Sequence, residues 1–209
     1  AIAGVKMSRE EIMHRLRGKK GSHVDLGVVR REISDTLHFD VVRDKIPVNS
    51  VDAAYMVTPR IGLIRFNNFA QTTHAEVVEA IKKLRTQGMV DLIIDLQQNG
   101  GGYLQAAADI ASEFLAKNDM IVYTRGRSVP NQEFRSSGSG LFTQGKVAVL
   151  VDEYSASAAE ILSGAIQDQD RGIVVGRRTF GKGLVQRPIE LPDGSMIRLG
   201  GDAGKNKLA

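Results

Sequence analysis

Residues 147–160 read VAVLVDEYSASAAE. The five apolar residues 147–151 predict a buried strand, and the small residues around Ser157 predict a helix that opens directly after it. In a layered α/β fold such a transition lies at the carboxyl edge of the sheet, where amides of a helix N-terminus can stabilise negative charge. Ser157 is therefore a candidate nucleophile. Ser and Ala at a helix start equally suit a cap and close packing, so the motif alone leaves both interpretations open.

The sequence around this motif alternates strands with helices. The pattern predicts strands at 61–66, 90–96, 120–124, 146–151 and 172–175, a helix capped by Thr73 and Glu76 with Val77, Ile81 and Leu84 inward, and a helix at 103–117. Apolar strands separated by amphipathic helices indicate a mixed α/β fold with a largely parallel sheet. Residues 128–144 are rich in Ser and Gly and are expected to form a mobile excursion.

The N-terminal part has a different pattern. Ser8 and Glu11 form a capping box for a helix at about 8–17, and residues 23–31 and 36–42 predict a hairpin. Pro47 restricts its own backbone and that of the residue before it, so residues 44–48 predict a hinge. We therefore expect a small unit at 1–46 and a core at 47–199. Residues 200–209 resemble a linker or cloning remnant.

Composition excludes several classes of protein. The 28 basic and 24 acidic residues are spread along the 209-residue chain, and no basic stripe is interleaved with aromatic residues, which disfavours nucleic-acid binding. The absence of cysteine excludes disulfides, thiolate metal sites and a cysteine nucleophile. The apolar runs are far shorter than the ~20 residues of a membrane helix, so we expect no stable membrane insertion in this segment. No His or carboxylate set has metal-ligand spacing.

A second motif, DLQQNGGG at residues 95–102, ends the predicted strand 90–96. Three glycines let backbone amides converge on an anion, which suits an oxyanion hole or a phosphate. Neither GxxxxGK[ST] nor GxGxxG is present, which disfavours the phosphate. A plain tight turn remains an alternative.

A third motif, TFGKG at residues 179–183, places Lys182 between two glycines. Such a lysine is commonly a solvated turn residue. To act as a base near neutral pH, a lysine needs a pKa lowered by burial from ~10.4 to about 7 or 8. The histidines precede or lie away from the three motifs, so none is an obvious base for a serine: His14, His23, His38 and His74.

Taken in order, the three motifs resemble the carboxyl-terminal processing peptidases, also called tail-specific proteases. The resemblance covers roughly residues 5–199, and the SASAxE and TFGKG elements are highly specific because Ser157 and Lys182 stand 25 residues apart, as in that family. The resemblance implies a crotonase-like ββα protease core with an inserted PDZ domain. Residues 1–46, a helix plus a hairpin, would correspond to the second half of the PDZ domain.

The resemblance also implies a mechanism. Ser157 would be the nucleophile, Lys182 the general base, and Gln186 the group that orients the lysine amine. In the active state we expect Lys182 to be buried within hydrogen-bond reach of Ser157. Acyl transfer of this kind needs no metal and no organic cofactor.

Supporting residues follow from the same resemblance. The amide of Ala158 and the amide of Gly101 or Gly102 would form the oxyanion hole. Glu160 and Thr179 would support the site by hydrogen-bonding the helix start and the lysine loop.

By this resemblance the partners would be polypeptides with free C-termini, recognised through a complete PDZ domain, in a bacterial periplasm or cell envelope. A homo-oligomer is left open. One rival is a PDZ-type peptide-binding scaffold with an inactive protease core. Another is a nucleotide-binding or small-molecule-binding α/β domain that uses residues 100–102.

Overall fold

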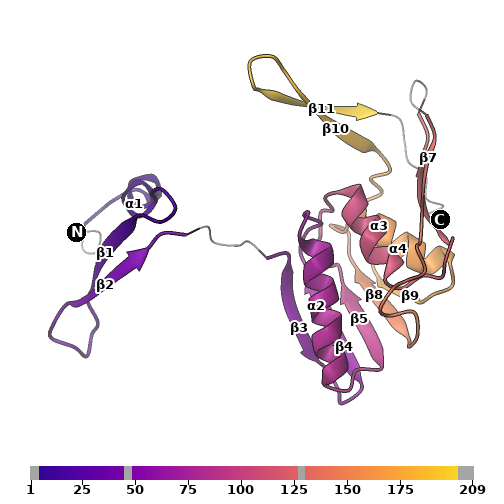
Figure 1. Ribbon diagram of the computed structural model, residues 1–209, viewed down its shortest axis with the longest axis horizontal. Helices are drawn as coiled ribbons and strands as arrows, with labels where there is room; N and C mark the ends of the chain where they lie inside the picture. The colour runs from indigo at the N-terminus through magenta and orange to yellow at the C-terminus, as the bar shows by residue number, and fades with distance from the viewer. Residues whose placement is uncertain (1–4, 45–48, 127–129, 202–209) are drawn as a thin grey trace. The chain divides into compact units, whose positions relative to one another are not determined.

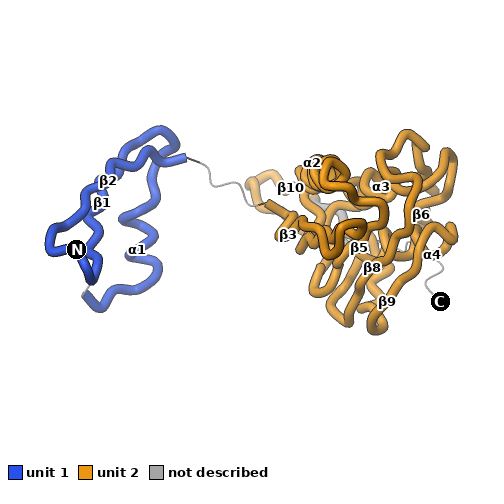
Figure 2. The backbone as a smooth tube through the Cα atoms, turned by 90° about the horizontal axis from the view of Figure 1, so that it is seen from below, with its two compact units in different colours: residues 1–48 blue, residues 49–209 orange. Residues whose placement is uncertain are grey.

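The computed structural model describes residues 5–44, 49–126 and 130–201. The chain forms two compact units, Ala1–Val48 and Asn49–Ala209, which are drawn in different colours in Figure 2. Most of the predicted hinge, residues 45–48, lies outside the described residues. Each unit is therefore described by itself.

The first unit contains one helix and one antiparallel hairpin, as predicted. Its elements are α1 (Arg9–Leu16), β1 (His23–Val28) and β2 (Leu37–Val42). The capping box is present, because the Glu11 amide donates to Ser8 Oγ and the Ser8 amide donates to Glu11 Oε2. Arg43 Nε donates to Leu16 O, which ties the helix to the hairpin. No residue in the described part of this unit is buried, since two strands and one short helix cannot enclose a core.

The second unit is built on a five-stranded sheet with the order β3-β4-β5-β8-β9. The strands are β3 (Val51–Met56), β4 (Ile61–Phe66), β5 (Asp91–Asp95), β8 (Val147–Val151) and β9 (Ile173–Gly176). Strand β3 pairs antiparallel with β4, and the other three neighbouring pairs are parallel. The expected mixed α/β fold with a largely parallel sheet is confirmed. The sequence patterns did not predict β3.

One face of the sheet carries the core. Burial alternates along the strands, so that Ile64 and Phe66 on β4 and Val147, Val149 and Val151 on β8 are buried while their neighbours are partly exposed. These side chains form one apolar cluster with residues of three helices. Figure 1 shows the helices next to the strands of the sheet. The helices are α2 (Thr73–Thr86), α3 (Leu104–Ser112) and α4 (Ala158–Asp168).

The predicted cap of α2 is wrong, although its inward residues Val77, Ile81 and Leu84 are buried as expected. The N-cap is Thr72, which makes no capping hydrogen bond through its side chain. Thr73 Oγ1 instead donates to Ser50 Oγ, and Glu76 accepts from the Ser50 amide. Hydrogen bonds to Ser50, directly before β3, therefore take the place of a local cap. They hold the start of α2 against the edge strand of the sheet.

Helix α3 ends earlier than predicted, at Ser112 rather than near residue 117. The chain turns there because Phe142 N donates to Glu113 O and Arg171 Nε donates to Phe114 O, which uses carbonyls that a longer helix would bond internally.

Within the described ranges no helix has the length and apolar character needed to cross a membrane.

Two antiparallel hairpins complete the second unit. Strand β6 (Met120–Thr124) pairs with β7 (Gln132–Arg135), and β10 (Val185–Glu190) pairs with β11 (Met196–Gly201). The expectation of a mobile excursion at 128–144 is wrong where β7 forms. The expected linker at 200–209 is wrong at its start, because the first two of its residues belong to β11, and residues 202–209 lie outside the described part.

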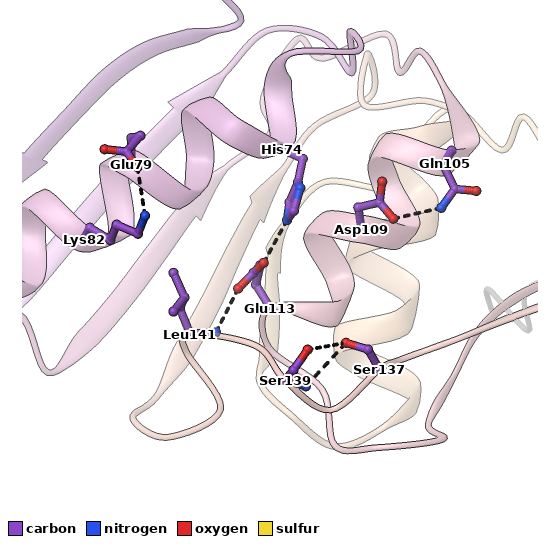
Figure 3. Close-up of polar contacts among 9 residues, drawn as sticks. All are labelled: His74, Glu79, Lys82, Gln105, Asp109, Glu113, Ser137, Ser139 and Leu141. Carbon is purple, nitrogen blue, oxygen red and sulfur yellow. Dashed lines mark hydrogen bonds and ion pairs between the residues drawn. The ribbon is translucent and has the colours of Figure 1, made fainter.

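A polar network joins α2, the end of α3 and the segment before β8. Figure 3 shows Glu113 between His74 and Leu141: its Oε1 lies 2.8 Å from His74 Nε2, and its Oε2 accepts from the Leu141 amide at 2.8 Å. The Glu113 side chain is only 12% exposed, so these bonds compensate for its removal from water. Ser137 and Ser139 bond each other nearby through their hydroxyls.

Asp152 joins the turns that follow β5 and β8. Its Oδ1 accepts from the amides of Gln98, Tyr154 and Ser155 and from the Ser155 hydroxyl. Burial raises the pKa of Asp152, but the Gln98 and Tyr154 amides and the Ser155 donors together hold the pKa below its ordinary value. The ionised carboxylate is thus the form that stabilises the fold.

We expect Asp152→Ala to lower the free energy of unfolding of this chain by about 2–4 kcal/mol at pH 7, because buried amides lose their acceptor. Because the pKa of Asp152 is lower in the folded state, its ionised carboxylate stabilises the folded state at pH values above the unfolded-state pKa of ~3.9. This stabilisation is lost as the pH falls through the folded-state pKa. The difference between wild type and variant should therefore shrink below about pH 4. Urea unfolding across pH measures it, and the control is Asp109→Ala, which removes a partly exposed carboxylate on α3. Equal stability at pH 7 would contradict the assignment.

Candidate functional site

Ser157 lies in a strained turn between β8 and α4. Its backbone has φ 57° and ψ −111°, outside the regions that non-glycine residues ordinarily adopt. Such a conformation costs of order 1–3 kcal/mol and persists only where the surroundings impose it, often at a functional site. Ser155, two residues earlier, is completely buried, and its hydroxyl donates to Leu96 O. Of the two serines in the motif, Ser157 is thus the one presented to a pocket.

The glycine turn after β5 lies against Ser157. Gly101 has φ 92°, and a Cβ added there would stand 2.5 Å from Ala156 O and 2.9 Å from Ala158 N. Gly102 has φ 153°, and a Cβ added there would stand 2.2 Å from Phe69 O. Both positions therefore require glycine, because any side chain would push the turn away from its neighbours.

The amides in this turn differ in their partners. Gly101 N donates to Asn99 Oδ1 at 2.9 Å. By contrast, the amides of Gly102 and Ala158 donate no hydrogen bond to any residue that the structure describes. Ala158 is the first residue of α4, whose amide has no partner within the helix.

Glu160 connects the turn that contains Ser157 (the serine turn) to the loop that contains Thr179, Gly181 and Lys182 (the lysine loop). Its Oε2 accepts from the amides of Ser157, at 2.7 Å, and Lys182, at 2.9 Å. Its Oε1 accepts from Thr179 Oγ1, at 2.8 Å, and the Gly181 amide, at 2.7 Å. The residue is 2% exposed, so all four bonds form away from bulk water. One carboxylate thereby fixes the backbone of Ser157 relative to that of Lys182.

The lysine side chain is half-buried and lies next to β10. Lys182 Nζ stands 3.5 Å from Gln186 Oε1, at the long limit of a hydrogen bond. In the described part of the chain no hydrogen bond joins Lys182 Nζ to Ser157 Oγ. The contact expected in the active state is therefore not formed in this conformation, although both residues line one pocket.

That pocket has a volume of about 680 Å³. Six of the residues for which the sequence predicted a role line it: Ser157, Lys182, Gln186, Glu160, Gly101 and Gly102. Thr179 and Ala158 are adjacent to it through Glu160 and Ser157. The rest of the lining is largely apolar and includes Phe69, Leu104, Val122, Ile161, Leu184 and Met196.

No histidine is among the described residues that line this pocket. His74 pairs with Glu113, and His23 and His38 pair with carboxylates of the N-terminal hairpin. No group of three or more His, Asp or Glu within the described ranges could hold a metal ion. The charged residues facing the pocket are Glu160, whose oxygens are bonded, and Lys182.

The sequence patterns missed two residues that shape the site. Asn99 is completely buried and bonds both Phe66 O and Gly101 N through its side chain. Asp152 holds the turn after β8. Asn99 stands directly before the glycines, but its partner Phe66 is 33 residues away, so no local pattern indicates the contact.

Comparison with known proteins identifies the family. A family model described as "Peptidase family S41" matches residues 60–204. The carboxyl-terminal-processing protease of Picosynechococcus sp. is 39% identical over 200 residues, which are 93% of this chain and 48% of that protein. The carboxy-terminal processing protease CtpB of Bacillus subtilis is 32% identical over 207 residues, or 95% of this chain and 42% of that protein. The chain thus spans about half the length of these relatives.

A solved structure agrees with the sequence relatives. The photosystem II D1 C-terminal processing protease is similar with a TM-score of 0.66 and 27% sequence identity, covering 90% of this chain and 52% of that one. The family match spans the strands from β4 to β11, the glycine turn, the serine turn and the lysine loop. The chain belongs to peptidase family S41.

Proposed function

We propose that the complete protein is a serine endopeptidase that cleaves polypeptides near their carboxyl termini. The observation that carries the proposal is the single Glu160 carboxylate, which bonds the backbone of both Ser157 and Lys182 at the edge of one pocket. A merely structural serine turn would not need a distant lysine loop fixed beside it. Family membership supports the same reading.

In the proposed mechanism the neutral amine of Lys182 accepts the proton of Ser157 while Oγ attacks the scissile carbonyl carbon. The tetrahedral intermediate then collapses, the C–N bond breaks, and the leaving amine takes the proton from Lys182. Water, deprotonated by the same lysine, hydrolyses the acyl-enzyme and restores the serine. Because Lys182 Nζ lies beside Gln186 here, we propose that it turns toward Ser157 when substrate fills the pocket.

We assign the oxyanion hole to the amides of Ala158 and Gly102. The Gly101 amide is less suited, because it already donates to Asn99 Oδ1. Two N–H groups that have no acceptor among the described residues, one in the serine turn and one in the glycine turn, suit an oxygen that gains charge during the reaction. Preorganised donors of this kind need no rearrangement at the moment of attack.

The pocket favours an apolar substrate side chain. Its lining is dominated by Phe69, Leu104, Val122 and Ile161, and the four donors on Glu160 leave that carboxylate little capacity to bind a cation.

We further propose that residues 1–46 belong to a PDZ domain that binds free C-termini. The helix and hairpin of this unit and the family resemblance support this proposal. A bacterial periplasm or cell envelope is the proposed location.

The rival is a peptide-binding scaffold with an inactive core. A fluorophosphonate label applied to the full-length protein separates the two. Labelling of Ser157 that is lost in both Ser157→Ala and Lys182→Ala supports the enzyme. A protein that binds C-terminal peptides but never labels would support the scaffold.

We expect Ser157→Ala to abolish proteolysis by the full-length enzyme while changing the free energy of unfolding by no more than about 1 kcal/mol. The hydroxyl is lost at a pocket, and the backbone bond to Glu160 remains. Ser155→Ala is the contrasting variant, because it loses a buried hydrogen bond to Leu96 O and should be less stable. An inactive Ser155→Ala beside a fully active Ser157→Ala would reverse the choice of nucleophile.

Lys182→Arg should be as inactive as Lys182→Ala, because a guanidinium keeps its charge and cannot accept the serine proton. Steady-state cleavage of a peptide with an apolar tail by the wild type and both variants measures this. Near-native turnover by the Arg variant would show that charge, not proton transfer, is what the position supplies.

Glu160→Gln should reduce kcat by at least about tenfold, because an amide NH₂ cannot accept from two of the four donors. The lysine loop should then become more accessible to amide hydrogen exchange. Glu113→Gln is the matched control, since Glu113 is also a largely buried carboxylate that accepts a backbone amide but lies outside the pocket lining. Equal losses of kcat in the two variants would refute a specific role for Glu160.

A further inference from the structure

We infer that Asn99 is a positioning residue for the oxyanion hole: by binding the Gly101 amide it leaves the Gly102 amide directed at the developing oxyanion. The inference rests on the proposed function and adds a residue to it. It concerns which of several adjacent glycine amides is presented to the substrate.

Both polar atoms of the Asn99 side chain form hydrogen bonds, one as a donor and one as an acceptor. Nδ2 donates to Phe66 O at 2.7 Å, at the end of β4, and Oδ1 accepts from Gly101 N at 2.9 Å. The residue is 0% exposed, so neither bond is replaced by water if it is lost. Only a side chain with a donor and an acceptor at the same end satisfies both groups, which explains asparagine at this position.

The bond to Gly101 selects one backbone arrangement of the turn. Consecutive glycines have a wide conformational range, so without a fixed contact several amides could alternate at the pocket. Gly101 O accepts from Phe69 N, and Phe69 O accepts from Tyr103 N. In an extended segment successive amides point to opposite sides, so the intervening Gly102 N–H points away from Phe69.

Asn99 also ties the glycine turn to the serine turn. Its backbone carbonyl accepts from Ala156 N at 3.0 Å, one residue before Ser157. The two proposed oxyanion donors belong to different turns, and Asn99 bonds to both turns. Loss of the side chain keeps this backbone bond but removes the bonds to Phe66 O and from Gly101 N. The Gly102 amide should therefore move relative to the Ala158 amide, while Ser157 and the lysine loop stay in place.

The test uses the full-length enzyme with Asn99→Ala and Asn99→Asp. We measure kcat, KM and the affinity for a peptidyl boronate with an apolar tail, whose tetrahedral adduct places an oxygen in the hole. Active sites are counted by fluorophosphonate titration so that only folded enzyme is compared. Asn99→Ala should lose about 10²–10³ in kcat, the loss typical of one oxyanion donor, with KM within about threefold. Boronate affinity should fall in parallel, and the pH profile should keep its position.

Asn99→Asp separates positioning from stability. It keeps an acceptor for Gly101 N but places a carboxylate against Phe66 O, so it should be less stable than wild type yet recover boronate affinity to within about tenfold. The control is Ser136→Ala, which also loses two hydrogen bonds of a buried side chain, to Leu115 O and from Gly138 N, outside the pocket lining. It should lose stability but not kcat.

The outcomes distinguish this inference from the proposed function. If wild type cleaves and labels, but Asn99→Ala keeps its kcat and boronate affinity, or Asn99→Asp is no better than Asn99→Ala, then Asn99 is structural only and the inference is overturned. If wild type itself neither cleaves nor labels, the proposed function fails and the inference fails with it.

Discussion

The buried Glu160 carboxylate is the interaction on which the site depends. Taking a carboxylate out of water is unfavourable unless hydrogen bonds replace its hydration, and here four donors do so. The donors come from two segments that the sequence separates, the start of α4 and the loop after β9. Glu160 is only 2% exposed, so water cannot replace these hydrogen bonds. Separating the two segments would leave a buried carboxylate without donors, and this keeps the segments together.

The parallel sheet provides the second constraint. Strands β5 and β8 are neighbours, so the turns that follow them meet at the same edge. The glycine turn can then approach the serine turn to within contact of backbone atoms, which only glycine permits. Asp152 links the same two turns, because it accepts hydrogen bonds from the amide of Gln98 after β5 and the amide of Tyr154 after β8. The strained backbone of Ser157 is maintained by these contacts on either side of it.

Local patterns predicted the strands and helices whose periodicity is strong, including β4, β6 and the inward face of α2. They failed where local preference and tertiary context differ. Strand β3 contains Asp52 and two alanines, which are weak strand formers, and it forms because it pairs with β4 at the edge of the sheet. Strand β7 is polar and short and exists through its pairing with β6.

The sequence by itself determined the parts of the site that lie in contiguous motifs: the serine turn, the glycine turn, the lysine loop, and Glu160 three residues after Ser157. These are encoded by residue type at fixed spacing, because each motif is one strand-to-helix or strand-to-loop transition. Only the tertiary structure decided that Asn99 bonds the Gly101 amide and not the Gly102 amide, and that Lys182 Nζ lies beside Gln186 in this conformation. Those features depend on contacts between residues that are far apart in the sequence, such as Asn99 and Phe66. Such contacts produce no periodic pattern in the sequence, so the sequence does not predict them.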